Sequence, residues 1–470
     1  MRYTKGNFWL ITVLIVAFLC GYAGIPSYRE TDPAVLQLRD AVKQNPNDAQ
    51  MRAELAAVYF QKYKEAKQQH YLEGSITEAR EALRLDGNCG LAHFYLSLAL
   101  IEKGTERGNE ALLDEAIGAY KEALRTGPGL AVAEGFPPAQ FLAATKYLAL
   151  SEKDSGLIDV AVRELQEAIR VKPGYAPSHA ILGGIYYHLK GEKDLAINAL
   201  KEAVRYNSDY LEAHKWLAGI YKAELQRAGA DRDEDTIELA IREYGAVIRL
   251  DPQDDEAHRE LSWVYRCKGS FDLSRAEAEA ALRLERSAEN HKALGDACLW
   301  KGDYAQARRE LQEAMKSRPH YQEARYSLAF TCYLEQRFKE AVEESNRCIM
   351  LEDPPRVEAI LLKYLSLQGM GRGAEADELI AEFSRCVAGE AWPSDLLAYY
   401  RGELRDSELL SKARHDFDRC TAYFYIGCRY LYQGHREKAR VYFRKCVETK
   451  ILDSFGYVGS RAELERLSTK

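Results

Sequence analysis

The chain has 470 residues, of which 47% are apolar, and a net charge of −7 from 65 basic and 72 acidic side chains. This length and apolar content allow a large buried core. Because the two signs of charge are mixed along the chain, with no basic block, the composition argues against nucleic acid as the main partner. Proline is scarce, with 13 residues, which argues against a disordered chain.

An apolar stretch lies close to the N-terminus. Arg2 and Lys5 precede residues 8–26, FWLITVLIVAFLCGYAGIP, which at ~1.5 Å per residue nearly cross a hydrocarbon layer of ~30 Å. Positive charge on the N-terminal flank keeps that end in the cytoplasm, so the remaining chain is exported. We expect one N-terminal transmembrane helix that acts as an uncleaved signal anchor. Two alternatives are a signal peptide cleaved after Ala23 and a lipoprotein signal acylated at Cys20.

The remaining sequence repeats one pattern. A bulky residue is followed by Leu three positions later, then by a small residue, and three positions further by an aromatic residue or Cys. The copies start at His179, His214, His258, His291 and Arg325, with a weaker copy at His93. A second set of small and large residues follows each copy, for example Ala307, Leu311 and Ala314. These spacings place the residues on one face of a helix, so each unit predicts two helices that approach closely at the small residues.

The units have a nearly constant length. From Pro252 through Arg286 to Pro319 and Asp353, the intervals are 34, 33 and 34 residues. Period, residue types and helix phase agree, so the chain resembles the tetratricopeptide-repeat (TPR) family over about 90% of its length. The resemblance implies an all-α fold, a right-handed TPR superhelix or α-solenoid, in which stacked helix pairs bury a shared core.

We expect three parts of the chain. Residues 1–26 form the membrane anchor or signal segment, residues 27–386 form an array of about nine TPR repeats, and residues 387–470 form a C-terminal TPR region with a capping helix. Within the array, the segment GPGLAVAEGFPPAQ at 127–140 predicts a loop, because its glycines and paired prolines cannot continue a helix.

The C-terminal part carries a second resemblance. One more repeat is marked by Tyr423, Gly427, Ala439 and Phe443, and the chain closes with SFGYVGSRAELERL. Together with the run AYFYIG, these features resemble the C-terminal TPR region of NlpI-like bacterial envelope adaptors. That resemblance implies a bacterial cell-envelope setting, in which such adaptors recruit enzymes of envelope maintenance.

No catalytic signature is present in the sequence. The patterns G-x-x-x-x-G-K-[ST], G-x-G-x-x-G, H-E-x-x-H and G-x-S-x-G do not occur. No two of the ten cysteines have C-x-x-C spacing, which argues against a zinc ribbon, a thioredoxin-type site and covalent haem attachment. We interpret most cysteines as core residues and the recurring histidines as structural. We therefore expect no enzyme, no catalytic residue, no cofactor and no metal.

The TPR resemblance implies that the first helix of each repeat lines a concave groove. Residues just after the bulky and small marks, over the repeats between about Glu212 and Leu334, should point into it. We call the following ten the groove residues: Lys215, Lys222, Arg259, Trp263, Arg266, Lys292, Trp300, Tyr326, Phe330 and Tyr333. Cations beside aromatic rings suit an extended or helical protein segment that carries acidic and apolar residues.

Two other interpretations of these residues compete. Some TPR proteins clamp a terminal carboxylate with paired Lys and Asn, but Gly219, Trp263 and Asp296 stand where that Asn would be. Alternatively, the cations are ordinary solvated charges and the rings pack between repeats.

The expected function is that of a membrane-anchored scaffold or adaptor at a bacterial inner membrane, with its repeats facing the periplasm and binding protein partners. One alternative is a structural subunit of a secretion, pilus or polysaccharide-export machine. Another is an enzyme with an unrecognised site. A stable complex of fixed composition would favour the subunit, whereas weak binding of several partners would favour the adaptor.

Overall fold

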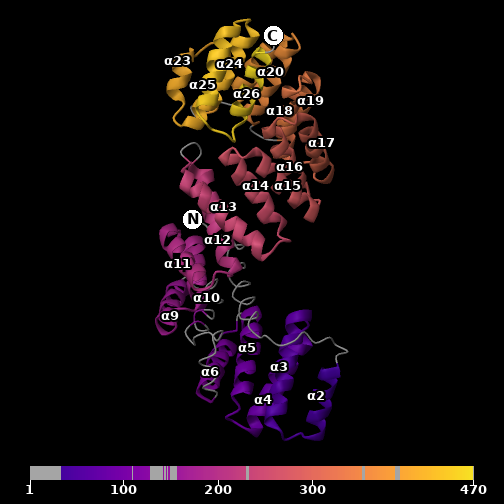
Figure 1. Cartoon of the computed structure of the whole chain (residues 1–470), viewed down its shortest axis with the longest axis vertical. Helices are drawn as coiled ribbons and strands as arrows, with labels where there is room; N and C mark the ends of the chain where they lie inside the picture. Colours follow the sequence, from indigo (N-terminus) through magenta and orange to yellow (C-terminus); the bar gives the residue numbers. More distant parts are fainter. Residues whose placement is uncertain are drawn as a thin grey trace. The chain divides into compact units, whose positions relative to one another are not determined.

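The computed structural model describes residues 33–107, 109–126, 141, 144, 147–148, 156–228, 232–351, 355–386 and 392–468. All regular secondary structure in these residues is helical (Figure 1). The chain forms two compact units, Met1–Trp216 and Leu217–Lys470. The predicted N-terminal membrane helix and the predicted loop at 127–140 both lie outside the described residues.

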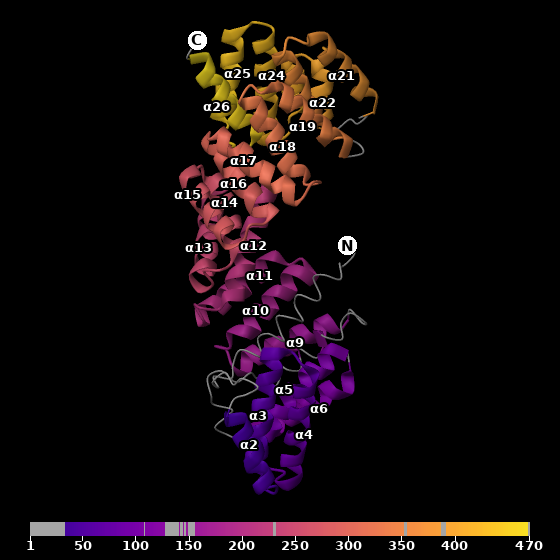
Figure 2. The same cartoon turned by 90° about the vertical axis from the view of Figure 1, so that its right-hand side faces the viewer.

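The first unit contains antiparallel helix pairs with short turns. Its described helices are α2 (Pro33–Gln44), α3 (Ala49–Ala66), α4 (Gln69–Leu85), α5 (Gly90–Arg107), α6 (Glu110–Thr126), α9 (Leu157–Val171), α10 (Ala176–Ile185), the π-helical turn η1 (Tyr186–Lys190) and α11 (Lys193–Tyr206). Within this unit, α3 packs on α4 and α5 packs on α6 (Figures 1 and 2). The next helix, α12 (Leu211–Ala228), contains the boundary between the units.

The second unit continues the same arrangement. Its helices are α13 (Glu234–Leu250), α14 (Asp255–Lys268), α15 (Phe271–Leu284), α16 (Ala288–Lys301), α17 (Tyr304–Ser317), α18 (Gln322–Leu334), α19 (Phe338–Leu351), α20 (Val357–Gly369), α21 (Gly373–Cys386), α22 (Ser394–Tyr400), α23 (Asp406–Lys412), α24 (Asp416–Tyr432), α25 (Arg436–Glu448) and α26 (Phe455–Ser468). Each pair from α14 to α19 packs on the next, as expected of an α-solenoid.

The small residue of the repeat pattern permits close helix contact, as the sequence predicts. A Cβ atom on Gly295 of α16 would lie 2.6 Å from Leu311 Cγ of α17, and one on Gly427 of α24 would lie 2.6 Å from a ring carbon of Phe443. Neither position could hold a larger side chain without moving its neighbour. The second-helix residues Ala307, Leu311 and Ala314 are fully buried.

The bulky residue that starts each copy of the repeat pattern contacts either the preceding turn or the second helix of its own pair. At the earlier copies a ring nitrogen lies 2.8–3.0 Å from the carbonyl oxygen six residues before it, at His93, His179 and His214. The imidazoles of His258 and His291 instead contact a glutamate nineteen residues later, at 2.6 and 2.9 Å. Arg325 makes both contacts, since its guanidinium donates to the Pro319 carbonyl and to Glu344. A long polar side chain recurs here because it satisfies groups on the adjoining turn and helix.

Short turns separate the helices of a pair. Gly269 and Gly302 follow α14 and α16 with φ values of 80° and 97°, which glycine adopts without a steric cost. Asp254 caps the start of α14, where its carboxylate accepts from the Ala257 amide at 2.8 Å.

Among the described residues, no helix is both long enough and apolar enough to span a membrane.

Candidate functional site

The groove residues stand on the first helices of successive pairs. Lys215 and Lys222 lie on α12, and Lys215 precedes the boundary between the units. The remaining residues come from α14, α16 and α18 of the second unit: Arg259, Trp263, Arg266, Lys292, Trp300, Tyr326, Phe330 and Tyr333. α14 contacts α16, and α16 contacts α18. That the ten residues line one surface stays a prediction.

The aromatic groove residues divide into two classes. Trp300, Tyr326, Phe330 and Tyr333 are buried, with 0–6% of each residue exposed. Trp263 is half-buried. The buried rings fit the packing interpretation, whereas Trp263 retains surface that a partner could contact. Whether any of the ten residues binds a partner stays a prediction.

The chain's own C-terminal segment, residues 450–468, covers the buried rings. The Trp300 indole Nε1 donates to the Leu452 carbonyl oxygen at 2.9 Å. Phe455 lies among the rings of Trp300, Tyr326 and Phe330, with centroid distances of 5.0, 4.9 and 5.0 Å. The pairs with Tyr326 and Phe330 are edge-to-face, and contacts of this kind stabilise beyond simple burial of area.

An acidic residue of the same segment forms a buried ion pair. Arg232 Nη1 lies 2.5 Å from Asp453 Oδ1, and their side chains are 12% and 9% exposed. The Arg232 guanidinium also lies 5.4 Å from the Trp263 ring centroid. Burial, together with the Asp453 carboxylate, raises the pKa of the nearby Cys267 thiol to about 12, so that thiol stays protonated.

Leu452 occupies the space beside the turn after α14. A Cβ atom on Gly269 would lie 2.7 Å from Leu452 Cδ1, so the glycine admits the leucine side chain. Residues 451–455, ILDSF, therefore present a backbone carbonyl, a carboxylate and apolar side chains to the groove. These are the features predicted for a partner segment, and here the same chain supplies them.

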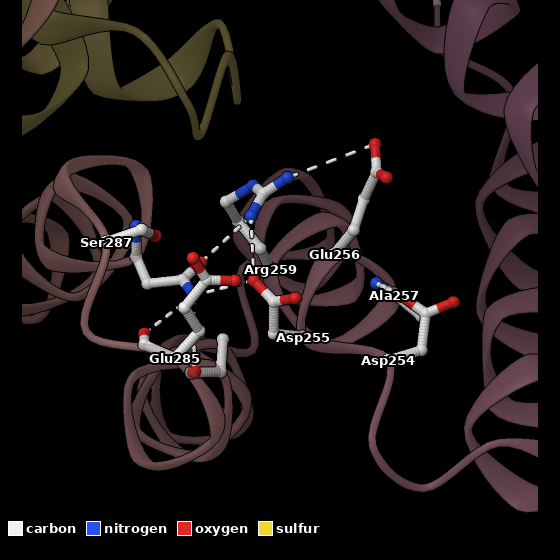
Figure 3. A network of polar contacts seen from close by, with 9 residues as sticks. Asp254, Asp255, Glu256, Ala257, Arg259, Glu285 and Ser287 are labelled. Atoms are coloured by element: carbon white, nitrogen blue, oxygen red, sulfur yellow. Dashed lines mark hydrogen bonds and ion pairs between the residues drawn. The ribbon is translucent and has the colours of Figure 1, made fainter.

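The cationic groove residues are paired within the fold. Arg259 lies between Asp255 and Glu256, with its guanidinium 3.3 and 3.9 Å from their carboxylates (Figure 3). It also donates to the Asn290 amide oxygen at 2.9 Å. Lys222 pairs with Glu260 at 2.5 Å. These charges are half-exposed, so their pairs do not close the surface to a partner.

A buried carboxylate joins two further groove residues. Asp296 accepts from Lys292 at 2.7 Å and lies 3.5 Å from Arg266, whose guanidinium is 4.5 Å from the Trp300 ring centroid. Burial acts to raise the pKa of Asp296, but the charges of Lys292 and Arg266, with hydrogen bonds from Lys292 and Ser327, outweigh it and lower the pKa below its usual range. Asp296 is therefore ionised at neutral pH and holds both cations in place.

Sequence reasoning missed the segment at 450–455. The repeat pattern ends with α25, and the five residues ILDSF have no periodicity that would assign them to a surface. The only available signal is chemical: an acidic residue between apolar ones, which resembles the partner segment expected for this groove.

Comparisons with known proteins identify the repeats. The tetratricopeptide-repeat family matches residues 301–364, which include all of α17, α18 and α19 and the first part of α20, and residues 421–450, which include most of α24 and all of α25. No curated protein matches this chain.

Several solved structures are similar at low identity. The type IV pilus biogenesis factor PilW is 16% identical, with a TM-score of 0.38, over 45% of this chain and 92% of its own. YrrB, a TPR protein with an unusual peptide-binding site, is 18% identical, with a TM-score of 0.34, over 44% of this chain and 100% of its own. A tetratricopeptide-repeat protein from Parabacteroides merdae is 15% identical, with a TM-score of 0.38, over 54% and 96%.

The family assignment rests on the two matched regions and on the helix pairs seen there, with their small residues at the contacts. The chain contains tetratricopeptide repeats at residues 301–364 and 421–450.

Proposed function

We propose that this TPR protein is an interaction scaffold whose groove in the second unit binds protein segments that carry acidic and apolar residues. One observation carries the proposal: residues 451–455 bind in this way within the chain. Their contacts are a carbonyl to Trp300, a carboxylate to Arg232 and a phenyl ring among three aromatic rings. Peptide recognition commonly combines main-chain and side-chain contacts in this way.

The part of the groove that remains for a partner is the half-exposed part. Lys222, Arg259, Trp263 and Lys292 keep accessible surface, whereas the rings of α18 do not. A tryptophan beside arginine and lysine side chains is a composition enriched in residues that dominate binding energy. The partner is expected to add to the surface beside residues 451–455 rather than to displace them.

Affinity purification from crosslinked cells tests the proposal. The chain is captured with and without the paired changes Arg259→Ala and Trp263→Ala. We expect the double variant to keep its helical circular dichroism and to lose the polypeptides that the parent captures. A folded double variant that captures the same polypeptides would remove the groove assignment.

We further propose the setting of this scaffold. Residues 8–26 would anchor the chain to a bacterial inner membrane, with the repeats in the periplasm; a cleaved signal would release them there instead. The support is the apolar run behind Arg2 and Lys5, together with the resemblance of the C-terminal TPR region, through AYFYIG and SFGYVGSRAELERL, to NlpI-like envelope adaptors. A periplasmic adaptor would recruit envelope proteins to the membrane surface.

A further inference from the structure

We propose a second interaction surface, on the last helix pair, that binds an acidic segment of a partner protein. The surface combines three tyrosines, two lysines and one valine of α24 and α25, and we call it the basic tyrosine surface: Tyr423, Tyr430, Lys438, Val441, Tyr442 and Lys445. It shares no residue with the groove, so it goes beyond the function proposed above. Figures 1 and 2 show α24 and α25 side by side.

The α25 members form one stripe. Lys438, Val441, Tyr442 and Lys445 have the spacing i, i+3, i+4 and i+7, which places them on one helical face. Both lysines are exposed and Val441 is 47% exposed. The buried residues of α25 are Ala439, Phe443 and Cys446, which face the helix contact instead.

The three rings lie in a row, with Lys438 beside Tyr430 at one end and Lys445 beside the other two rings. Tyr442 stacks on Tyr430 at 5.7 Å with an angle of 10° between the rings, and lies 6.3 Å from Tyr423. The Lys438 ammonium is 5.2 Å from the Tyr430 centroid, and the Lys445 ammonium is 5.3 Å from that of Tyr442. The row therefore presents ring surface with positive charge beside it.

One carboxylate fixes two of the three rings. Asp406 Oδ2 accepts from the hydroxyls of Tyr430 and Tyr442, each at 2.8 Å, and Asp406 Oδ1 accepts from Tyr399 at 2.9 Å. Burial and the Asp406 carboxylate raise the pKa of Tyr442, so its hydroxyl remains a donor. A partner therefore meets rings whose side-chain entropy is already lost, which favours binding.

The cations of α25 are only partly paired. Several exposed cations elsewhere pair with a glutamate three residues earlier, as in Arg84, Arg125, Arg170, Arg205 and Lys316, and Arg440 of α25 pairs with Glu437 in the same way. Within the part of the chain that the structure describes, Lys438 and Lys445 have no ion pair. The helix 436–448 carries five cations and two carboxylates, which is a charge of +3 in a chain of net charge −7.

The charges and rings of the basic tyrosine surface determine which class of partner it can bind. Two unpaired lysines attract carboxylates, and rigid tyrosine rings with an exposed valine accept apolar side chains or the methylene groups of glutamates. The surface is a ridge of rings rather than a basic block, so an acidic protein segment fits it better than a nucleic acid backbone.

Fluorescence anisotropy with a labelled poly-glutamate peptide tests the proposal on the full chain in detergent. We expect binding that weakens with added salt and no binding of the matching poly-glutamine peptide. The double change Lys438→Glu and Lys445→Glu should weaken binding at least about tenfold. The matched double change Arg170→Glu and Lys316→Glu alters net charge equally and should leave binding within about twofold of the parent.

A change that neutralises Asp406 distinguishes the contribution of the rigid rings to binding from the contribution of charge alone. Asp406→Asn removes one negative charge, so simple electrostatics predicts tighter binding of poly-glutamate. Loss of the anchored hydroxyls predicts weaker binding, and we expect a loss of about threefold or more. Glu437→Gln, an exposed neutralisation on the same helix, should leave binding unchanged or slightly tighter.

Several outcomes would overturn the proposal. They are no binding of poly-glutamate, equal losses in the two double variants, and tighter binding in Asp406→Asn. Stronger binding of single-stranded DNA or of phosphatidylglycerol vesicles through Lys438 and Lys445 would assign the surface to another class of partner. The groove variant Arg259→Ala with Trp263→Ala should bind poly-glutamate like the parent, which separates this surface from the groove.

Discussion

At Gly295, the absence of a side chain lets α16 and α17 touch. A Cβ atom built on Gly295 would lie 2.6 Å from Leu311 Cγ, and the same arrangement recurs at Gly427 with Phe443. The sequence predicts these contacts because the small residue repeats at a fixed helical phase. Gly245 of α13 shows the contrast, since nothing lies within 4 Å of a Cβ atom built there.

Gly295→Leu should therefore destabilise the second unit by roughly 1–3 kcal/mol or more, because the added side chain overlaps Leu311. Ala307→Leu, at a fully buried position of α17, should act in the same direction. Thermal melting followed by circular dichroism measures the effect. Gly245→Leu is the matched control and should melt close to the parent; equal melting of all these variants would remove the close-contact explanation.

The groove residues show where sequence reasoning ends at this scale. Their helices and their phase are predictable, because both follow from the repeat. The burial of Trp300 and Tyr326 is not, because it depends on Phe455, which lies more than a hundred positions further along the chain. Long-range contacts of this kind leave no local pattern in the sequence.

At the scale of elements, the C-terminal segment joins parts of the second unit that are far apart in the chain. Residues 450–455 contact the turn after α14, and the first residues of α26 contact α16 and α18. The sequence predicts a capping helix at the end of the chain, and α26 is the last described helix. The contacts of the preceding loop with α14 and α16 were not predicted, because each is made by a single residue without a repeat.

Asp453→Ala should weaken this link. It leaves the Arg232 guanidinium largely buried without its carboxylate, at a cost of roughly 2–4 kcal/mol. Hydrogen exchange should show faster exchange of the α26 amides and of the turn after α14. Glu313→Ala removes a carboxylate from an exposed pair and should leave the exchange close to that of the parent. Unchanged exchange in Asp453→Ala would mean that the ion pair does not hold the segment.

At the scale of the whole molecule, the predicted and observed divisions differ in kind. From composition, and from where the repeat pattern becomes less regular, the sequence predicts three parts of the chain, residues 1–26, 27–386 and 387–470. The structure has compact units that meet between Trp216 and Leu217, within α12. A continuous helix carries no break in composition, so this division could not be predicted from pattern. The boundary predicted at 386 falls beside residues 387–391, outside the described residues.

Topology is a property of the whole chain and is open to a direct test. Because Arg2 and Lys5 precede residues 8–26, a reporter fused after Lys470 should be active if it functions only in the periplasm. A reporter that functions only in the cytoplasm should be silent at the same site. The opposite pair of results would reverse the proposed orientation.

The central claim is that the groove of the second unit binds another polypeptide, and site-specific photo-crosslinking tests it most directly. A photoreactive residue is placed at Arg259 or Lys292 in the groove, and at Arg309, an exposed position on the second helix of a pair, as the control. In living cells we expect covalent adducts with a second protein from the two groove positions and none from Arg309. Adducts from Arg309 alone, or none from either groove position, would contradict the account.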